Sequence, residues 1–329
     1  MYLLIYVDDL LLVCAQEEEI DKVEQALRER LKITSLGEIS NFLGIRVRRN
    51  TDNFFVISQG AFIKRMASRF GLNNAKGSKY PMDPGYYKVT EKSPKMENNE
   101  EYHRLIGCLL YISVNSRPDI SAVVGILSRK ISCPSVTDWT EAKRVVRYLL
   151  HTVHFGLTLG TNGCELLLSG YCDADWAGDS SDRKSCTGYI FSLGGATVTW
   201  ASRKQGCVAM STMEAEYVAL SEATQEAIWL RRLLDELNEK QQCPTIIFED
   251  NRSCLDFVTL DQQKRRSKHI DTWYHFTRNC CSTGIIELQY CASEYMLADI
   301  LTKPLGSTKV KKFATEMGLA NVPIEESRG

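Results

Sequence analysis

The chain has 329 residues, 44% of them hydrophobic and 25% charged, and a formal net charge of −1. This length and composition predict a globular protein of about two domains. A net charge near zero excludes a general attraction to nucleic acid, so any such binding requires local basic patches. Twelve cysteines without metal-type spacing indicate reduced thiols in an intracellular protein, cytoplasmic or nuclear.

The first segment contains two apolar runs, Leu3–Val7 and Leu10–Val13, on either side of Asp8 and Asp9. We expect neither an export signal nor a membrane span here, because the acidic pair interrupts the apolar stretch. The pattern predicts two buried strands around a tight acidic turn. An ordinary hairpin accounts for the aspartates, which favour turns. A turn with two carboxylates can also present them to a divalent metal.

Tyr6-Val7-Asp8-Asp9 resembles the metal-binding motif of reverse transcriptases, specifically those of copia-type retrotransposons. The resemblance continues to about Pro304 through four further motifs: Leu36–Ile39, Asn41–Ile45, Arg69–Leu72 and Ser116–Ile120. In that family a third carboxylate lies upstream of the acidic turn, and this sequence begins at Met1. We therefore expect no DNA polymerisation by this chain alone. We interpret Asp8 and Asp9 as a relic polymerase metal site, or as half of a site completed by other sequence.

The next elements are mostly helical. Apolar residues at helical spacing predict an amphipathic helix over Ile20–Leu31, and residues 54–57 read as a strand followed by a helix over Ala61–Phe70. Tyr80–Glu101 is rich in Pro, Lys and Asn and is the best candidate for a linker. Three more helices are expected: Tyr102–Val114, Ile120–Ile131 and Trp139–Leu150.

From Glu165 onward the pattern predicts a strand, a hairpin, a helix, a strand, a helix, a strand and a helix. The first strand leads to Asp173, a long helix runs over Met213–Leu237, and a strand over Thr245–Phe248 ends at Asp250. This order implies a mixed sheet, with three antiparallel strands and then two that helical crossovers make parallel. Asp173 and Asp250 would end neighbouring strands at one sheet edge. Glu214 and Asp299 lie in the first turns of two helices.

This pattern is similar to the ribonuclease H domain of the same elements. The resemblance assigns Asp173, Glu214, Asp250 and Asp299 as catalytic residues and metal ligands. Hard carboxylate oxygens suit two Mg²⁺ or Mn²⁺ ions. The implied reaction is cleavage of the RNA strand of RNA–DNA hybrids, in which the 2′-hydroxyl distinguishes RNA from DNA.

Each of these carboxylates has an alternative interpretation. Glu214 completes a Ser-x-x-Glu capping pattern with Ser211. Asp250 could cap a turn or helix, and Asp299 could suit the positive end of its helix. Asp175 shares a strand face with Asp173, and the residues most easily confused with Glu214 and Asp250 are Glu216 and Glu249.

The densest basic run contains Lys264, Arg265, Arg266 and Lys268. It is either a solvated loop or a contact to nucleic-acid phosphates, and its position next to a helix of the nuclease-like half favours phosphates. A nuclear-import patch is a further reading.

The predicted fold class is α/β: an α+β remnant of a reverse-transcriptase palm and thumb, then a ribonuclease H-like mixed five-stranded sheet with flanking helices. We expect the remnant over residues 1–100, a helical thumb or connection segment over 101–160, the ribonuclease H-like domain over 161–305, and a tail over 306–329 that frays at its end. Two alternatives stay open. The chain could be a non-catalytic relic that at most binds nucleic acid, or a fragment of a full reverse-transcriptase polyprotein.

Overall fold

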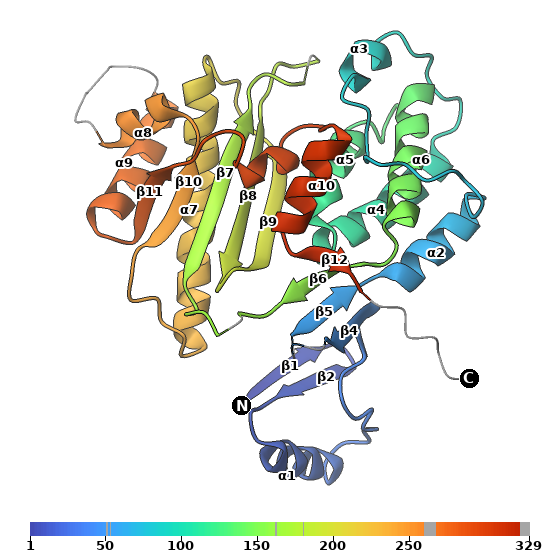
Figure 1. The fold of residues 1–329 in the computed structure, drawn as a ribbon, viewed down its shortest axis with the longest axis vertical. Coiled ribbons are helices and arrows are strands. Elements are labelled where there is room, and N and C mark those ends of the chain that lie inside the picture. The colour runs from blue at the N-terminus through green and yellow to red at the C-terminus, as the bar shows by residue number, and fades with distance from the viewer. Residues whose placement is uncertain (51, 53, 162, 180, 260–267, 323–329) are drawn as a thin grey trace.

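The computed structural model describes residues 1–50, 52, 54–161, 163–179, 181–259 and 268–322, except for the side chains of 268–274. Its strands form one two-stranded and two five-stranded sheets, with helices packed between and around them (Figure 1). The predicted α/β class with a mixed five-stranded sheet is confirmed.

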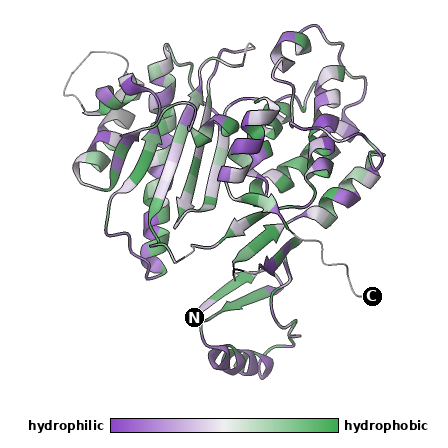
Figure 2. Ribbon diagram, viewed as in Figure 1, coloured by the Kyte–Doolittle hydropathy of each residue, from purple (hydrophilic) through white to green (hydrophobic). Residues whose placement is uncertain are grey.

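The amino-terminal hairpin consists of β1 (Tyr2–Tyr6) and β2 (Asp9–Val13), followed by α1 (Glu17–Arg28). The predicted strands and turn are present, but the predicted burial is wrong. Ile5 is 66% exposed and Val7 83%, because the two strands form a sheet of their own with mainly exposed side chains. Figure 2 shows the apolar character of this hairpin at one end of the molecule. None of the residues of α1 is buried either.

The first five-stranded sheet joins early, middle and late parts of the chain. Its order is β12-β6-β5-β4-β3, and every neighbouring pair is antiparallel. The strands are β3 (Asn41–Phe42), β4 (Ile45–Arg49), β5 (Phe55–Ser58), β6 (Phe155–Leu159) and β12 (Leu319–Asn321).

Residues 307–321 were expected to belong to a tail, and they instead form α10 (Ser307–Glu316) and β12. The reason is an apolar stripe: Val310, Phe313 and Met317 are almost completely buried, since they recur at helical spacing and pack into the main core.

A helical layer follows the first sheet. It contains α2 (Gly60–Arg69), α3 (Tyr86–Thr90), α4 (Glu100–Asn115), the 3₁₀ helix η1 (Pro118–Ile120), α5 (Ser121–Ser128) and α6 (Val136–His151). The expected linker over Tyr80–Glu101 packs onto this layer: Met82 and Tyr86 are fully buried. The Tyr86 hydroxyl donates to Asp138 Oδ1 at 2.6 Å, and Asp138 forms a capping box with Ser135 at the start of α6.

The second five-stranded sheet, called the mixed sheet below, has the order β11-β10-β7-β8-β9. Its strands are β7 (Leu168–Asp175), β8 (Cys186–Leu193), β9 (Ala196–Lys204), β10 (Thr245–Glu249) and β11 (Ile286–Tyr290). The pairs β7–β8 and β8–β9 are antiparallel, and β10 is parallel to both β7 and β11. The predicted strand directions are confirmed.

Helices α7 (Thr212–Glu236), α8 (Arg252–Thr259) and α9 (Lys268–Ser282) flank the mixed sheet on the side away from the helical layer (Figure 1). On β8 the side chains alternate: Tyr189 and Phe191 pack with α7, whereas Ile190 packs with the helical layer. The last predicted helix, near Asp299, is a 3₁₀ helix, η2 (Leu297–Leu301).

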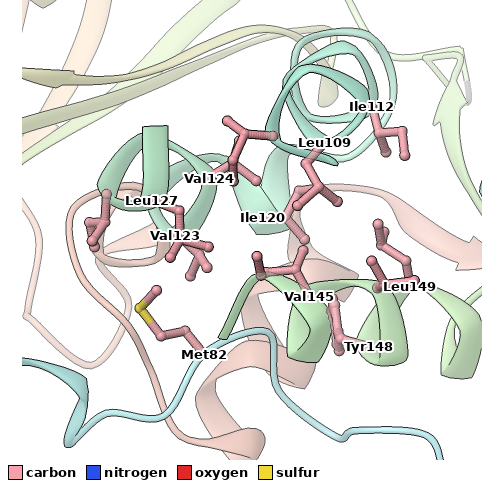
Figure 3. Close-up of a cluster of buried hydrophobic side chains, with 14 of the residues drawn as sticks. Met82, Leu109, Ile112, Ile120, Val123, Val124, Leu127, Val145, Tyr148 and Leu149 are labelled. Carbon is pink, nitrogen blue, oxygen red and sulfur yellow. The ribbon is translucent and has the colours of Figure 1, made fainter. Parts of the chain in front are cut away.

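The largest buried cluster contains residues from several of the expected domains. Figure 3 shows Leu109, Val123 and Leu149 of the helical layer in one buried cluster. Leu301 and Phe313 belong to the same cluster. The boundaries at 160/161 and 305/306 therefore do not coincide with breaks in packing. In the described part of the chain, no helix is long and apolar enough to cross a membrane.

Candidate metal centre

The site begins at the edge of the mixed sheet where β7 and β10 lie side by side. Their parallel register pairs Phe248 with Tyr171. Continued by two residues, this register brings Asp250 level with Asp173. Asp173 lies near the carboxyl end of β7, and Asp250 directly follows β10. The prediction that two neighbouring strands deliver these carboxylates to one edge is confirmed.

A third carboxylate comes from α7. Ligand atoms of Asp173, Glu216 and Asp250 all lie within 4.8 Å of one another. Asp173 is only 3% exposed and Glu216 only 7%. One carboxylate oxygen of Glu216, Oε2, is buried without a hydrogen-bond partner. A buried carboxylate oxygen without a donor is costly, and it points to a ligand that completes the site.

Glu214, which the family resemblance assigned to this cluster, lies elsewhere. Its backbone N–H donates to the Ser211 side chain at 3.2 Å, and its own Oε2 accepts from the Met210 N–H at 2.6 Å. Glu214 thus serves the amino-terminal end of α7, as in the capping interpretation. The physical reason is helix geometry: two residues further on, the side chain of Glu216 lies on the opposite side of the helix and is directed at the sheet.

A sequence signal for Glu216 exists. Glu216 precedes Leu220, Ala223 and Ala227 by four, seven and eleven residues, so it falls on the buried stripe of α7. A glutamate on an otherwise apolar stripe is the unusual observation, whereas Glu214 follows a common capping pattern.

Asp299 reaches the same region from η2, but it is engaged by lysines. Lys303 Nζ lies 2.7 Å from Asp299 Oδ1, and Lys309 Nζ lies 3.1 Å from Oδ2. Lys303 also lies 4.0 Å from Asp173 Oδ2, to which the Thr302 hydroxyl donates at 2.5 Å. Asp299 is therefore next to Asp173, but it is not one of the three carboxylates that converge.

The crowded carboxylates have perturbed protonation. Burial raises the pKa of Asp173 to about 6, although the nearby Lys303 opposes the shift. Burial also raises the pKa of Glu216 well above its ordinary value, reinforced by the negative charges of Glu249 and Asp173. The positive charge near Asp173 and Glu216 is too small to offset the effect of their burial. A bound cation would therefore stabilise the ionised forms of both carboxylates.

Glu249 lies behind this edge. It is fully buried, and it accepts hydrogen bonds from the Asn251 N–H at 3.0 Å and from Cys172 Sγ at 3.3 Å. Burial raises its pKa to about 8. Glu249 therefore supports the loop that carries Asp250 and points away from solvent.

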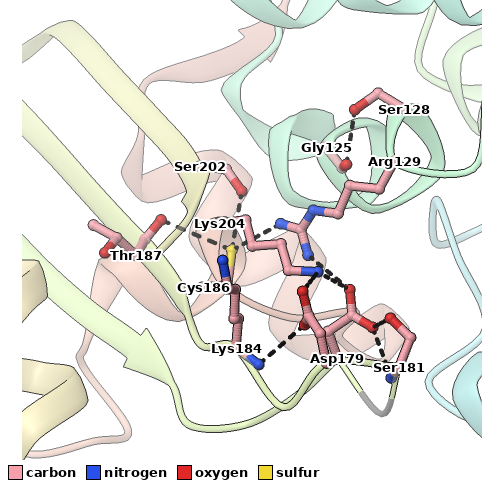
Figure 4. A network of polar contacts seen from close by, with 11 residues as sticks. Gly125, Ser128, Arg129, Asp179, Ser181, Lys184, Cys186, Thr187, Ser202 and Lys204 are labelled. Carbon is pink, nitrogen blue, oxygen red and sulfur yellow. Dashed lines mark hydrogen bonds and ion pairs between the residues drawn. The ribbon is translucent and has the colours of Figure 1, made fainter. Parts of the chain in front are cut away.

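A polar network fixes the segment after β7. Asp179 Oδ2 accepts from Lys204 Nζ at 2.6 Å, and Asp179 Oδ1 accepts from the Ser181 hydroxyl at 2.5 Å. Arg129, at the end of α5, lies 4.0 Å from Asp179 and donates to Cys186 Sγ at 3.4 Å (Figure 4). These contacts tie the loop beyond Asp175 to the sheet and to the helical layer. Asp175 itself is not part of the three-carboxylate cluster.

The remaining predicted residues lie apart or outside the described structure. Asp8 and Asp9 are exposed at the turn of the hairpin, and among the described residues no third acidic group gathers with them into a metal-type cluster. Lys264, Arg265 and Arg266 are outside the described residues, as is the side chain of Lys268. The prediction of phosphate contacts by this basic run stays a prediction.

Comparison with known proteins adds to this geometry. A family model described as reverse transcriptase (RNA-dependent DNA polymerase) matches residues 1–84. The chain is 36% identical over 315 residues to the retrovirus-related Pol polyprotein from transposon TNT 1-94 of Nicotiana tabacum, covering 93% of this chain and 23% of that protein. It is 32% identical over 227 residues to a putative transposon Ty5-1 protein of Saccharomyces cerevisiae, covering 69% and 73%.

The chain spans less than a quarter of the length of the first curated relatives, 23% and 22%. Among solved structures, the foamy viral protease-reverse transcriptase in complex with RNA/DNA hybrid matches 88% of this chain and 36% of its own. The TM-score is 0.50 at 16% identity, a likeness of fold.

Proposed function

Since the chain belongs to the copia-type Pol polyproteins of retrotransposons, we propose that its mixed sheet carries a ribonuclease H-type activity that cleaves the RNA strand of RNA–DNA hybrids. The observation that carries the proposal is the convergence of Asp173, Glu216 and Asp250 within 4.8 Å, from two neighbouring strands and a helix. Three carboxylates at the carboxyl edge of a sheet are a suitable set for hard divalent cations.

The residues present fit a Mg²⁺ or Mn²⁺ centre. All the ligand atoms are carboxylate oxygens. The Glu216 oxygen that has no hydrogen-bond partner is available to coordinate an ion. Asp173, Glu216 and Asp250 would hold one ion, and Asp173 with Asp299 a second. When bound, such ions supply activation of a water and stabilisation of the leaving oxygen in phosphodiester hydrolysis.

The protein's own residues hold this set in place. The Thr302 hydroxyl fixes the orientation of Asp173 by its 2.5 Å hydrogen bond. Ser211 and Glu214 fix the first turn of α7, which sets the direction of Glu216. Backbone pairing of β7 with β10 sets the spacing of Asp173 and Asp250. Hybrid as substrate is supported by the family and by the hybrid bound to the foamy viral relative in fold.

The test is cleavage of a labelled RNA strand in an RNA–DNA hybrid with Mg²⁺. We expect Asp173→Asn and Glu216→Gln each to lower the rate about 100-fold or more, because a metal supplies several kcal/mol of transition-state stabilisation and each 1.36 kcal/mol is tenfold. Addition of EDTA should abolish cleavage, and an RNA duplex or DNA duplex of the same sequence should stay intact.

Glu214→Gln is the matched control. It alters a glutamate of the same helix turn but keeps an oxygen that can accept from Met210, so we expect activity within about threefold of the unaltered chain. Loss of cleavage in Glu214→Gln with retention in Glu216→Gln would reverse the assignment. Hybrid binding without any cleavage would identify a nucleic-acid-binding module instead of a nuclease.

A further inference from the structure

Lys303 lies between two aspartates at the candidate metal centre. Its ammonium nitrogen is 2.7 Å from Asp299 Oδ1 and 4.0 Å from Asp173 Oδ2. The two aspartate side chains are only 5% and 4% exposed, while the lysine side chain is 37% exposed. The lysine thus reaches from the solvent side into the gap between two buried anions.

The charges in this region are divided unevenly. Asp299 has one ammonium on each carboxylate oxygen, from Lys303 and from Lys309 at 3.1 Å. Among the described residues, neither Glu216 nor Asp250 has an ion pair with a lysine or arginine. The three-carboxylate cluster is therefore open to a cation, whereas the gap between Asp173 and Asp299 already contains one.

We propose that Lys303 occupies the second cation position in the free protein, so that the chain alone binds one divalent ion and admits another only after the lysine side chain has moved. The inference rests on the proposed function, because it concerns the same metal centre. An ammonium and a divalent cation repel strongly at such separations, so only one of them can occupy the space between Asp173 and Asp299 and neutralise their charges.

Nucleic acid supplies the means to displace the lysine. A lysine side chain is a compact charge on a flexible stem, and phosphate is an anion that it binds readily. A phosphodiester placed at the site offers Lys303 a replacement for Asp299 and Asp173. Their oxygens are then free for the second ion, so occupancy of that position is coupled to the presence of substrate.

The experiment measures Mn²⁺ binding to the full chain by isothermal titration calorimetry. The unaltered chain should bind one ion tightly and a second ion only weakly. In Lys303→Met the dissociation constant of the second ion should be at least about tenfold lower than in the unaltered chain. Lys303→Arg keeps the charge and should restore the unaltered behaviour. Lys309→Met removes the charge on the other oxygen of Asp299 and should change binding in the same direction, but less.

Lys311→Met is the matched control. Lys311 lies on α10 close to Lys309 in sequence, and in the described structure it forms no ion pair with Asp299 or Asp173. We expect its Mn²⁺ binding to equal that of the unaltered chain. Binding of the first ion at least as tightly as in the unaltered chain shows in each variant that the centre is folded, since removal of Lys303 also takes a positive charge away from Asp173.

A hybrid with a 2′-O-methylated RNA strand, which cannot be cleaved through this route, provides the second arm. With it, the unaltered chain should bind two ions instead of one. Equal second-ion affinity in Lys303→Met and the unaltered chain, or a stoichiometry that stays at one with the hybrid, would overturn the inference and leave the three-carboxylate site intact. Absence of Mn²⁺ binding in every protein would overturn the metal centre and the proposed function with it.

Discussion

Arg117 is the largest fully buried side chain of the described structure, and its position explains the motif Ser116–Ile120 in structural terms. Its guanidinium donates to both oxygens of Asp119, at 2.9 and 2.7 Å, and to the hydroxyl of Thr152 at 2.7 Å. The Tyr148 hydroxyl donates to the same aspartate at 2.6 Å. The arginine thus joins η1 to the end of α6 through a satisfied bidentate pair.

Arg117→Met should lower the free energy of unfolding by about 3–5 kcal/mol, because it leaves Asp119 buried without its cation. Urea unfolding followed by circular dichroism measures the difference. Arg104→Met provides the comparison, since Arg104 forms exposed ion pairs with Glu100 and Glu101 on α4 and should cost no more than about 1 kcal/mol. An equal decrease in the free energy of unfolding in the two variants would show that the buried ion pair contributes no more to stability than the exposed ones.

At the scale of elements, Gly188 determines how closely η2 approaches the mixed sheet. It pairs directly with Asp173 across the β7–β8 ladder. A Cβ at this position would lie 2.7 Å from Thr302 Cγ2 and 2.9 Å from Leu301 Cβ. Without a side chain there, η2 can pack against β8 and bring Asp299 and Thr302 to Asp173.

Gly188→Ala should therefore destabilise the fold by about 1–3 kcal/mol, the usual cost of overpacking, and shift η2 away from Asp173. Thermal unfolding measures the first effect, and loss of hybrid cleavage measures the second. Gly206→Ala is the control, because an added Cβ at Gly206 would meet no atom within 4 Å. A Gly188→Ala chain as stable and active as the control would show that η2 tolerates displacement.

The elements around the site were largely predictable, and the reason is the strength of their patterns. Apolar strands separated by long helical repeats left little choice of order or direction for β7, β10 and β11. The choice between Glu214 and Glu216 was harder, because both lie in the first two turns of α7 and only the direction of each side chain separates them. Burial of β1 and β2 was unpredictable for a different reason. A pattern of apolar residues indicates that one face of a strand can be buried, but it does not show whether another element covers that face.

At the scale of the whole molecule, α10 packs into the core between the helical layer and the mixed sheet. Phe313 is fully buried in the cluster that also contains residues of α4, α5 and α6. Contacts of this kind between segments far apart in sequence make the parts of a protein unfold together.

Phe313→Ala should lower the free energy of unfolding by about 3–5 kcal/mol, through lost burial and the cavity that remains. Differential scanning calorimetry should show one transition in both the unaltered chain and the variant, at a lower temperature in the variant. Thr308→Ala, at an exposed position of the same helix, should leave the transition nearly unchanged. Two separate transitions would mean that the helical layer and the mixed sheet are independent units.

The pairing of β12 with β6 has a mechanical consequence. Leu319 is opposite Leu157, and Asn321 is opposite Phe155. The strand that precedes the mixed sheet in sequence, β6, is therefore paired with the strand that follows it, β12. Two chain connections between the sheets, joined at their β6 and β12 ends by backbone hydrogen bonds, resist rotation of one sheet against the other better than a single connection does. We therefore expect this pairing to restrict rotation of the mixed sheet relative to the first five-stranded sheet.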